Sequence, residues 1–277
     1  MSLLVDTEGF VALSPALLEL FECRLHAFWH LQHTQPAPSL PAIVERAAHL
    51  VLFELPRQGW PSDYQLILPI LANQALGQEW SRFALPEEIF QSERSRLLEM
   101  LTRFLATWTP PTDERVFVDL LCTGEDQRER IREQCYLDLV TAPLGRPGTI
   151  QVIDFRRSLP SSQSLGVDMA VELQAVMAIR QLRPPSLVNV RWVSLETGEQ
   201  RDMLPGRSPK AYAETHQVAA DIRQGNWRAI PCRFCPICPV EGCHYRPDLV
   251  EAREFALTTL QEHGLDSWPD LAQLGAQ

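Results

Sequence analysis

The chain has 277 residues, of which 45% are hydrophobic, and a formal net charge of −10 at pH 7. These proportions exclude a disordered chain and leave room for a full hydrophobic core. The negative charge does not favour nucleic-acid binding, but the placement of the basic residues decides that question rather than their sum. No apolar run approaches the roughly 20 residues of a membrane helix, and the N-terminus lacks the basic region of a secretory signal. A cytoplasmic protein without membrane contact is expected.

Helical patterns fill the first part of the chain. Ser14 and Pro15 are typical of a helix start, because serine caps free N–H groups and proline suits the first turn. Apolar residues then recur at helical spacing, and Pro56 is expected to lie beyond the end of the second helix. The helices predicted in this part cover residues 14–32, 43–55, 62–78 and 86–108.

The pattern changes to strands after Pro110-Pro111. Apolar and β-branched runs predict a three-strand antiparallel meander, with a turn around Arg146. A helix, a strand and a helix follow, which predicts an α/β domain over residues 1–277 with a helical part (1–109), an α/β core (110–226) and a cysteine-rich tail (227–277). The predicted elements of the core are strands at 116–121, 131–141, 149–156 and 187–195, and helices at 165–182 and 208–224.

Two aspartates face each other if the turn between the second and third strands is centred near Arg146. Asp138 and Asp154 then have Cβ atoms about 5 Å apart on one face of the hairpin. Both could bind one cation, since carboxylate oxygens are the ligands that Mg2+ and Mn2+ prefer. Arg156 shares the face of Asp154, because strand side chains alternate. The alternative is a pair of solvated aspartates at a sheet edge.

The tail concentrates sulfur ligands in the segment 232–243. A Cys-x2-Cys pair lets one tight turn direct two thiolates at the same metal. Inert buried thiols are the alternative, although the segment lacks the periodicity of a core face. Two kinds of metal site remain open. Zinc could be held by Cys232, Cys235, Cys238 and Cys243, with His244 nearby; an iron–sulfur site could use a cysteine from elsewhere in the chain.

These motifs resemble those of the RecB-type nucleases of the PD-(D/E)XK superfamily, particularly the iron–sulfur branch that includes Cas4 and the nuclease domain of AddB. In that family a cysteine at the end of an N-terminal helix, followed by an aromatic residue, is one cluster ligand. The segment Leu13-Ser-Pro-Ala-Leu-Leu-Glu-Leu-Phe-Glu-Cys23, with Phe28, is similar, although Arg24 replaces the usual proline. The resemblance implies a restriction-endonuclease-like core, with a central mixed sheet flanked by helices. It also implies a 4Fe-4S cluster held by Cys23, Cys235, Cys238 and Cys243.

The resemblance further implies a nuclease centre. The segments around Asp138 and Asp154 are similar to the family's I-D-x-V and V-x-D-x-K motifs. His49 matches a helical histidine that completes the metal sphere, and Gln174 matches the glutamine of a Q-x-x-x-Y motif whose tyrosine is alanine here. The implied roles are binding of Mg2+ or Mn2+ by His49, Asp138 and Asp154, and orientation of the site or substrate by Gln174. The alternatives are a surface or core histidine and an ordinary helical glutamine.

Arg156 stands where the family has a lysine that is thought to position or deprotonate the attacking water. Arginine keeps the positive charge but stays protonated, so contact with the scissile phosphate is its expected role. The leading interpretation is a metal-dependent DNA nuclease, acting on single strands or duplex ends in DNA repair, recombination or defence. The alternatives are a catalytically inactive DNA-binding or scaffold subunit of a larger complex, with a helicase or another subunit as partner, and a zinc-binding interaction protein.

Overall fold

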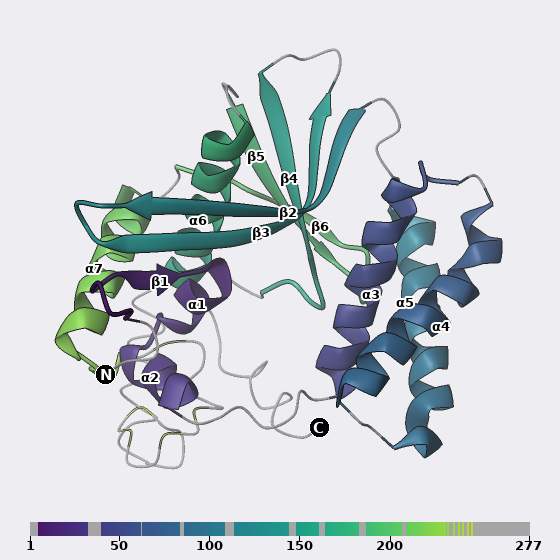
Figure 1. The fold of residues 1–277 in the computed structure, drawn as a ribbon, viewed down its shortest axis with the longest axis horizontal. Helices are drawn as coiled ribbons and strands as arrows, with labels where there is room; N and C mark the ends of the chain where they lie inside the picture. Colours follow the sequence, from purple (N-terminus) through teal and green to yellow (C-terminus); the bar gives the residue numbers. More distant parts are fainter. Residues whose placement is uncertain are drawn as a thin grey trace.

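The structure is a computed structural model with a mixed α/β fold, in which one mixed sheet has helices on both faces (Figure 1). The fold class is the one predicted. Three sequence features named above, Pro110-Pro111, Arg146 and His244, lie outside the described residues. The structure describes residues 5–32, 40–61, 63–83, 86–108, 114–143, 148–160, 164–182, 187–206 and 209–230, with Cys232, Cys235, Cys238, Val240, Cys243 and Tyr245.

Apart from β1, the described residues up to Thr107 form helices, and the other strands follow from Glu114 onward together with two further helices (Figure 1). The strands are β1 (Val11–Leu13), β2 (Glu114–Asp126), β3 (Ile131–Pro143), β4 (Thr149–Arg156), β5 (Leu187–Ser194) and β6 (Gln200–Met203). The helices are α1 (Pro15–Leu20), α2 (Arg24–Gln32), α3 (Leu40–Arg57), α4 (Tyr64–Phe83), the short 3-10 helix η1 (Glu87–Ile89), α5 (Phe90–Thr107), α6 (Leu165–Leu182) and α7 (Pro209–Gln224).

The predicted antiparallel meander is confirmed, since β2 pairs with β3 and β3 with β4 in antiparallel directions. The sheet then continues with β5 parallel to β4, which is possible because α6 carries the chain back along the sheet. β6 pairs antiparallel with β5, and β1 pairs parallel with one end of β3. Parallel and antiparallel pairs together make the sheet mixed.

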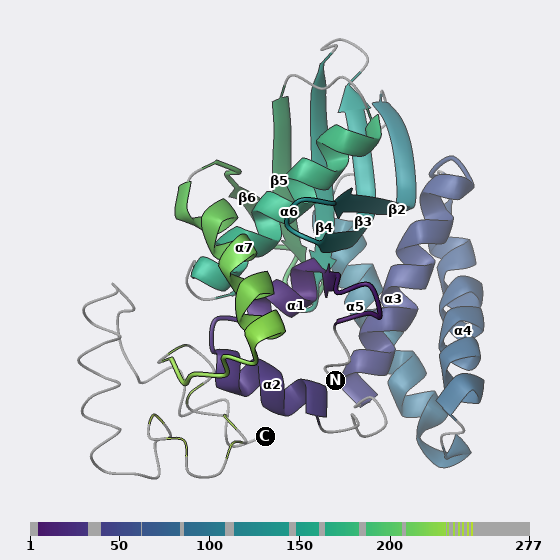
Figure 2. The ribbon, with the colours of Figure 1, turned by 60° about the vertical axis from the view of Figure 1, so that its left-hand side comes forward.

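Two hydrophobic cores cover the two faces of the sheet. On one face Val140, Val152 and Trp192 pack with residues of α1, α6 and α7. On the other face Ile153 and Phe155 pack with residues of α3, α4 and α5. Figure 2 shows the two groups of helices on opposite sides of the strands. Side chains of β4 therefore point alternately into one core and the other, as expected for a sheet that is buried on both faces.

Four features differ from the prediction. The helix expected over 14–32 is broken between α1 and α2, where Phe21 N–H donates to Leu18 O at 3.1 Å and tightens the last turn. Helix α3 continues to Arg57 rather than ending before Pro56, because proline keeps a helical φ in the last turn. The strands β1 and β6 were not predicted, since each is short and depends on a neighbouring strand for its hydrogen bonds.

No helix in the described part of the chain combines the length and the apolar character needed to span a membrane.

Candidate functional site

Two of the predicted site residues, Asp138 and Asp154, lie on the antiparallel strands β3 and β4. Leu139 pairs with Ile153, so the same register carried one residue further places Asp138 opposite Asp154. The charge of Asp154 acts on the Asp138 carboxyl and raises its pKa, as expected for neighbouring carboxylates. The observed pairing ends at Leu139 and Ile153, so the facing of the two aspartates across the hairpin stays a prediction.

The sheet bends at the same place. Strands β2 and β3 change direction midway (Figure 1), and Asp119 in β2 has a φ of 51°, which is uncommon for a residue other than glycine. On the neighbouring strand Leu137 packs in the core beside α6, whereas Leu139 packs in the core beside α3. The Asp138 side chain between them therefore lies at the seam of the two cores. Such backbone strain is concentrated at functional sites in proteins.

His49 in α3 is linked to Asp138 by two hydrogen bonds that both involve the backbone of Phe155. Nε2 of His49 lies 2.8 Å from Phe155 O, and Phe155 N–H donates to Oδ2 of Asp138 at 2.8 Å. Donation from Nε2 to the carbonyl leaves Nδ1 as the nitrogen with a lone pair. His49 and Asp138 therefore both bond to the backbone of Phe155, the residue after Asp154. Carboxylates are the ligands that Mg2+ and Mn2+ prefer.

The Asp138 carboxyl carries the largest electrostatic perturbation of this site. Burial raises its pKa to about 7, with a contribution in the same direction from the charge of Asp154. His49, the Phe155 N–H and Arg156 act in the opposite direction. A divalent cation between the two carboxylates would relieve their repulsion. In the described part of the chain no group of three or more His, Cys, Asp or Glu residues is placed so that it could hold a metal ion, so binding would require these side chains to move.

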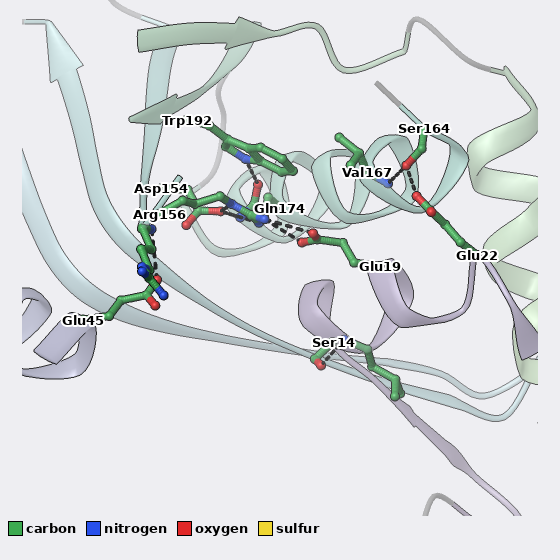
Figure 3. Close-up of polar contacts among 12 residues, drawn as sticks. Ser14, Glu19, Glu22, Glu45, Asp154, Arg156, Ser164, Val167, Gln174 and Trp192 are labelled. Atoms are coloured by element: carbon green, nitrogen blue, oxygen red, sulfur yellow. Dashed lines mark hydrogen bonds and ion pairs between the residues drawn. The ribbon is translucent and has the colours of Figure 1, made fainter. Parts of the chain in front are cut away.

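Arg156 is shared between two carboxylates (Figure 3). Nε and Nη2 donate to Oδ2 of Asp154 at 3.0 and 2.9 Å, and Nη1 lies 2.8 Å from Oε1 of Glu19 in α1. The guanidinium also stacks on Trp192, with Cζ 3.4 Å from the ring centroid. Burial lowers the pKa of Arg156, but the charges of Asp154 and Glu19 outweigh it and raise that pKa above its ordinary value. Arg156 therefore stays protonated.

Gln174 of α6 holds the same carboxylate oxygen. Its Nε2 donates to Oδ2 of Asp154 at 2.6 Å, and its Oε1 accepts the indole N–H of Trp192 at 3.2 Å. The side chain is buried, with 3% of its surface exposed, so Gln174 is not an ordinary exposed helical residue. Ala178, at the position of the family's tyrosine, lies in the core.

Three residues of this site were not predicted: Glu19, Trp192 and Glu45. Glu45 lies one helical turn before His49, and its Oε1 accepts the Arg157 N–H at 3.0 Å (Figure 3). Their spacing on α3 was the available signal, since residues at i and i+4 share a helix face. Glu19 and Trp192 gave no such signal, because their partners lie far away in the sequence.

A cavity of about 400 Å³ opens beside Glu45. Arg157 lines it together with Arg96 and Arg103 of α5, and each of these arginines is paired with a glutamate. A phosphate-bearing ligand would therefore compete with carboxylates for them. Ion pairs this exposed are weak, so such competition costs little.

A second cluster joins the start of α2 to the tail. Cys23 lies in the break between α1 and α2 and packs with Cys232 and Cys235. Beside them Trp227 stacks on Phe28, with ring centroids 4.7 Å apart. The approach of the N-terminal cysteine segment to the tail, expected from the resemblance, is therefore present in the structure.

Cys238 and Cys243 lie near this cluster, and all five cysteines are buried. The Cys232 thiol lies within hydrogen-bonding reach of the sulfurs of both Cys23 and Cys235, and its single proton can bond to either one. This contact lowers the pKa of Cys23 to about 6 and also lowers the pKa of Cys235. Cys232 N–H donates to Sγ of Cys235 at 3.2 Å. Burial raises the pKa of Cys238 to about 11. Burial also raises the pKa of Cys243, whose side chain is hydrogen-bonded to that of Cys238. The sulfur atoms of all five cysteines therefore lie near one another.

The chemistry of this sulfur set fits a thiolate-bound metal group. Thiolates are the ligands of both structural zinc and iron–sulfur clusters, and backbone N–H groups bonded to sulfur are typical around clusters. Cys232, for which the family pattern has no use, lies between Cys23 and Cys235. Each thiolate of a cluster binds its own iron atom, which spaces the sulfurs more widely than a single ion does.

No family model matches the chain, and no curated protein matches it. A protein of Eubacterium rectale described as a candidate exonuclease is 12% identical, with a TM-score of 0.44 over 81% of this chain and 86% of its own. The protein SSO0001 is 13% identical, with a TM-score of 0.31 over 82% of this chain and 95% of its own. Identity and TM-score are low in both cases, so neither likeness carries an argument about function.

Proposed function

We propose that this protein is a metal-dependent DNA nuclease, in which Asp138, Asp154 and His49 hold Mg2+ or Mn2+ beside the scissile phosphate. The observation that supports the proposal is that Asp138 of β3 and His49 of α3 both bond to the backbone of Phe155, the residue after Asp154 in β4. Burying two neighbouring carboxylates is unfavourable unless a proton or cation offsets their repulsion. Proteins accept that cost mainly at functional sites.

The roles of the residues follow from their contacts. When bound, the cation supplies positive charge to the transition state and activates a water molecule. His49 is held in one tautomer by its bond to Phe155 O. Gln174 fixes the orientation of the Asp154 carboxylate, and Arg156 directs a permanent positive charge to the phosphate.

The proposal includes a 4Fe-4S cluster that joins the α1–α2 segment to the tail. Its ligands would be Cys23, Cys235, Cys238 and Cys243. Burial of these sulfurs and the thiol contacts among them support the assignment. Zinc bound with Cys232 in place of Cys23 is the alternative, because Cys232 lies in the same cluster. Single-stranded DNA or duplex ends are the proposed substrates, in repair, recombination or defence.

A second candidate function is a catalytically silent DNA-binding or scaffold subunit, working with a helicase or another subunit. One observation favours it: the Arg156 fork is occupied by Asp154 and Glu19 rather than presented as a single outward charge. An arginine held in this way stabilises the fold while its capacity to bind phosphate is partly used.

The test is cleavage of end-labelled single- and double-stranded DNA, with Mn2+ and without it. Native protein and Asp202→Asn, a control at an exposed ion pair on β6, are expected to cleave with Mn2+. Asp138→Asn is expected to lose at least about a hundredfold in rate, since a metal ligand is removed. Native protein that binds DNA but does not cut it supports the second candidate. Equal cleavage by native protein and Asp138→Asn contradicts the proposed site.

A further inference from the structure

The Arg156 guanidinium connects α1 to the acidic pair (Figure 3). Nη1 lies 2.8 and 3.0 Å from the two carboxylate oxygens of Glu19, while Nε and Nη2 are bonded to Asp154. The Glu19 side chain is 15% exposed and that of Arg156 20%. At such burial solvent screens these charges only in part. The position of Glu19 therefore affects how strongly Arg156 binds Asp154.

Packing holds Glu19 in its place. Ser14 caps α1, with Oγ accepting Leu17 N–H at 3.3 Å. At the other end of α1 the start of α6 approaches so closely that a Cβ on Gly166 would lie 2.6 Å from Cγ of Glu22 and 3.0 Å from Glu19 O. Only glycine permits this approach without a shift of the helix. The Glu19 carboxylate is thus presented to Arg156 by a rigid support.

We propose that Glu19 is a positioning residue of the acidic site, which shares the charge of Arg156 and thereby keeps Asp154 available to a cation. The inference rests on the proposed function, because the cation site is the proposed one. Without Glu19, the uncompensated guanidinium would bind Asp154 more strongly and compete with the metal. It would also be more available to a DNA phosphate. Loss of Glu19 is therefore expected to weaken metal binding and strengthen DNA binding, two effects of opposite sign that simple destabilisation does not produce.

The experiment compares the full-length native protein with Glu19→Gln, Glu22→Gln and the double variant Glu19→Gln/Arg156→Gln. Glu22→Gln is the matched control, because it removes the same charge close by from a residue bonded to Ser164. Mn2+ affinity is measured by titration, and affinity for a labelled single-stranded oligonucleotide by fluorescence anisotropy at several salt concentrations without Mn2+. Melting temperatures verify folding, and Glu19→Ala, which also removes the charge, replaces Glu19→Gln if that variant does not fold.

Glu19→Gln is expected to bind Mn2+ about tenfold more weakly than native protein, from the loss of one nearby partly buried charge. The oligonucleotide should bind more tightly, with a salt dependence steeper by about one phosphate contact. Glu22→Gln should stay near native in both measurements, and the double variant should regain Mn2+ affinity. If Glu19→Gln and Glu22→Gln behave alike, or the double variant regains nothing, the inference is overturned.

Failure of the proposed function is recognised separately, from the native protein alone. Native protein that binds Mn2+ but neither binds nor cuts DNA contradicts the nuclease, while the Mn2+ comparison still decides the role of Glu19. If the native protein does not bind Mn2+, all variants will look alike in the titration. This result would count against both the proposed function and the role of Glu19.

Discussion

The acidic site and the cysteine cluster use neighbouring residues of one segment, Glu19 and Cys23, but they are built in different ways. In the acidic site Asp138 and Asp154 lie on two strands that are hydrogen-bonded to each other, and Arg156 offsets part of the negative charge of the two carboxylates. In the cysteine cluster the α1–α2 segment meets a tail with which it shares no sheet, and the thiols bond mainly to one another.

This difference predicts two kinds of response to the loss of a metal ligand. The acidic site keeps its strands without a cation, so losing a carboxylate is expected to cost activity but not the fold. The cysteine cluster joins distant parts of the chain, so losing a sulfur releases a long loop and is expected to cost stability as well.

The largest effect is expected for Cys23→Ser. The variant should lose bound iron and its brown colour, and its free energy of unfolding should fall by roughly 2–5 kcal/mol, comparable to removing a cross-link. Iron analysis, visible absorption and thermal unfolding measure these effects. Cys122→Ser is the control, since Cys122 is buried in the sheet core away from the tail and its loss should leave the metal content unchanged. Stoichiometric zinc without iron in native protein contradicts the cluster.

Cys232→Ser separates the two possible ligand sets. If Cys23, Cys235, Cys238 and Cys243 hold the metal, the variant should keep its metal and lose only the thiol contacts of Cys232. If the four tail cysteines hold zinc, metal should be lost. Metal analysis of the purified variant, with Cys122→Ser beside it, distinguishes the two.

The next effect concerns the acidic pair. Asp138→Ala and Asp154→Ala should each abolish stabilisation by Mn2+, which for native protein would be about 2.7 kcal/mol at a metal concentration 100 times the Kd. Neither variant should unfold, because the repulsion between the carboxylates disappears, although Asp154→Ala should be the less stable of the two, since it leaves Arg156 with Glu19 alone. Thermal unfolding with and without Mn2+ gives the result, and Asp202→Asn should behave as native protein. Unaltered Mn2+ stabilisation in both variants would exclude this pair as the metal site.

Arg156→Lys tests the residue on which the two candidate functions differ. Lysine retains the charge, so DNA affinity should be kept and the cleavage rate should change by less than about tenfold if the cation activates water without a base. Single-turnover cleavage measures this. An inert native protein that Arg156→Lys revives would show instead that a lysine is indispensable.

The smallest expected effect is at the contact between α1 and α6. Gly166→Ala should lower the free energy of unfolding by about 1–3 kcal/mol, because its Cβ would overlap Glu22. Gly77→Ala is the matched control in α4, where no atom lies within 4 Å of the new Cβ, and it should stabilise the protein by about 0.4–1 kcal/mol. Denaturant unfolding of both variants measures the difference. Equal stability of the two would mean that α1 is not held firmly against α6.

The sequence by itself determined the features that depend on neighbouring residues. Alternating apolar residues and a glycine-proline turn determined the hairpin of β3 and β4, and with it the predicted facing of Asp138 and Asp154. The spacing of the tail cysteines likewise indicated a sulfur cluster. These features could be predicted because strand periodicity and tight turns leave little choice of geometry.

Only the tertiary structure decided which distant groups complete each site. Glu19 binds Arg156, Trp192 orients Gln174, and Cys232 lies between Cys23 and Cys235, although none of these contacts has a local pattern. The break between α1 and α2 was also missed, since it turns Cys23 toward the tail against the helical periodicity. The physical reason is that contacts between distant segments depend on how helices pack on a sheet, and that packing is determined by the whole core rather than by any one segment.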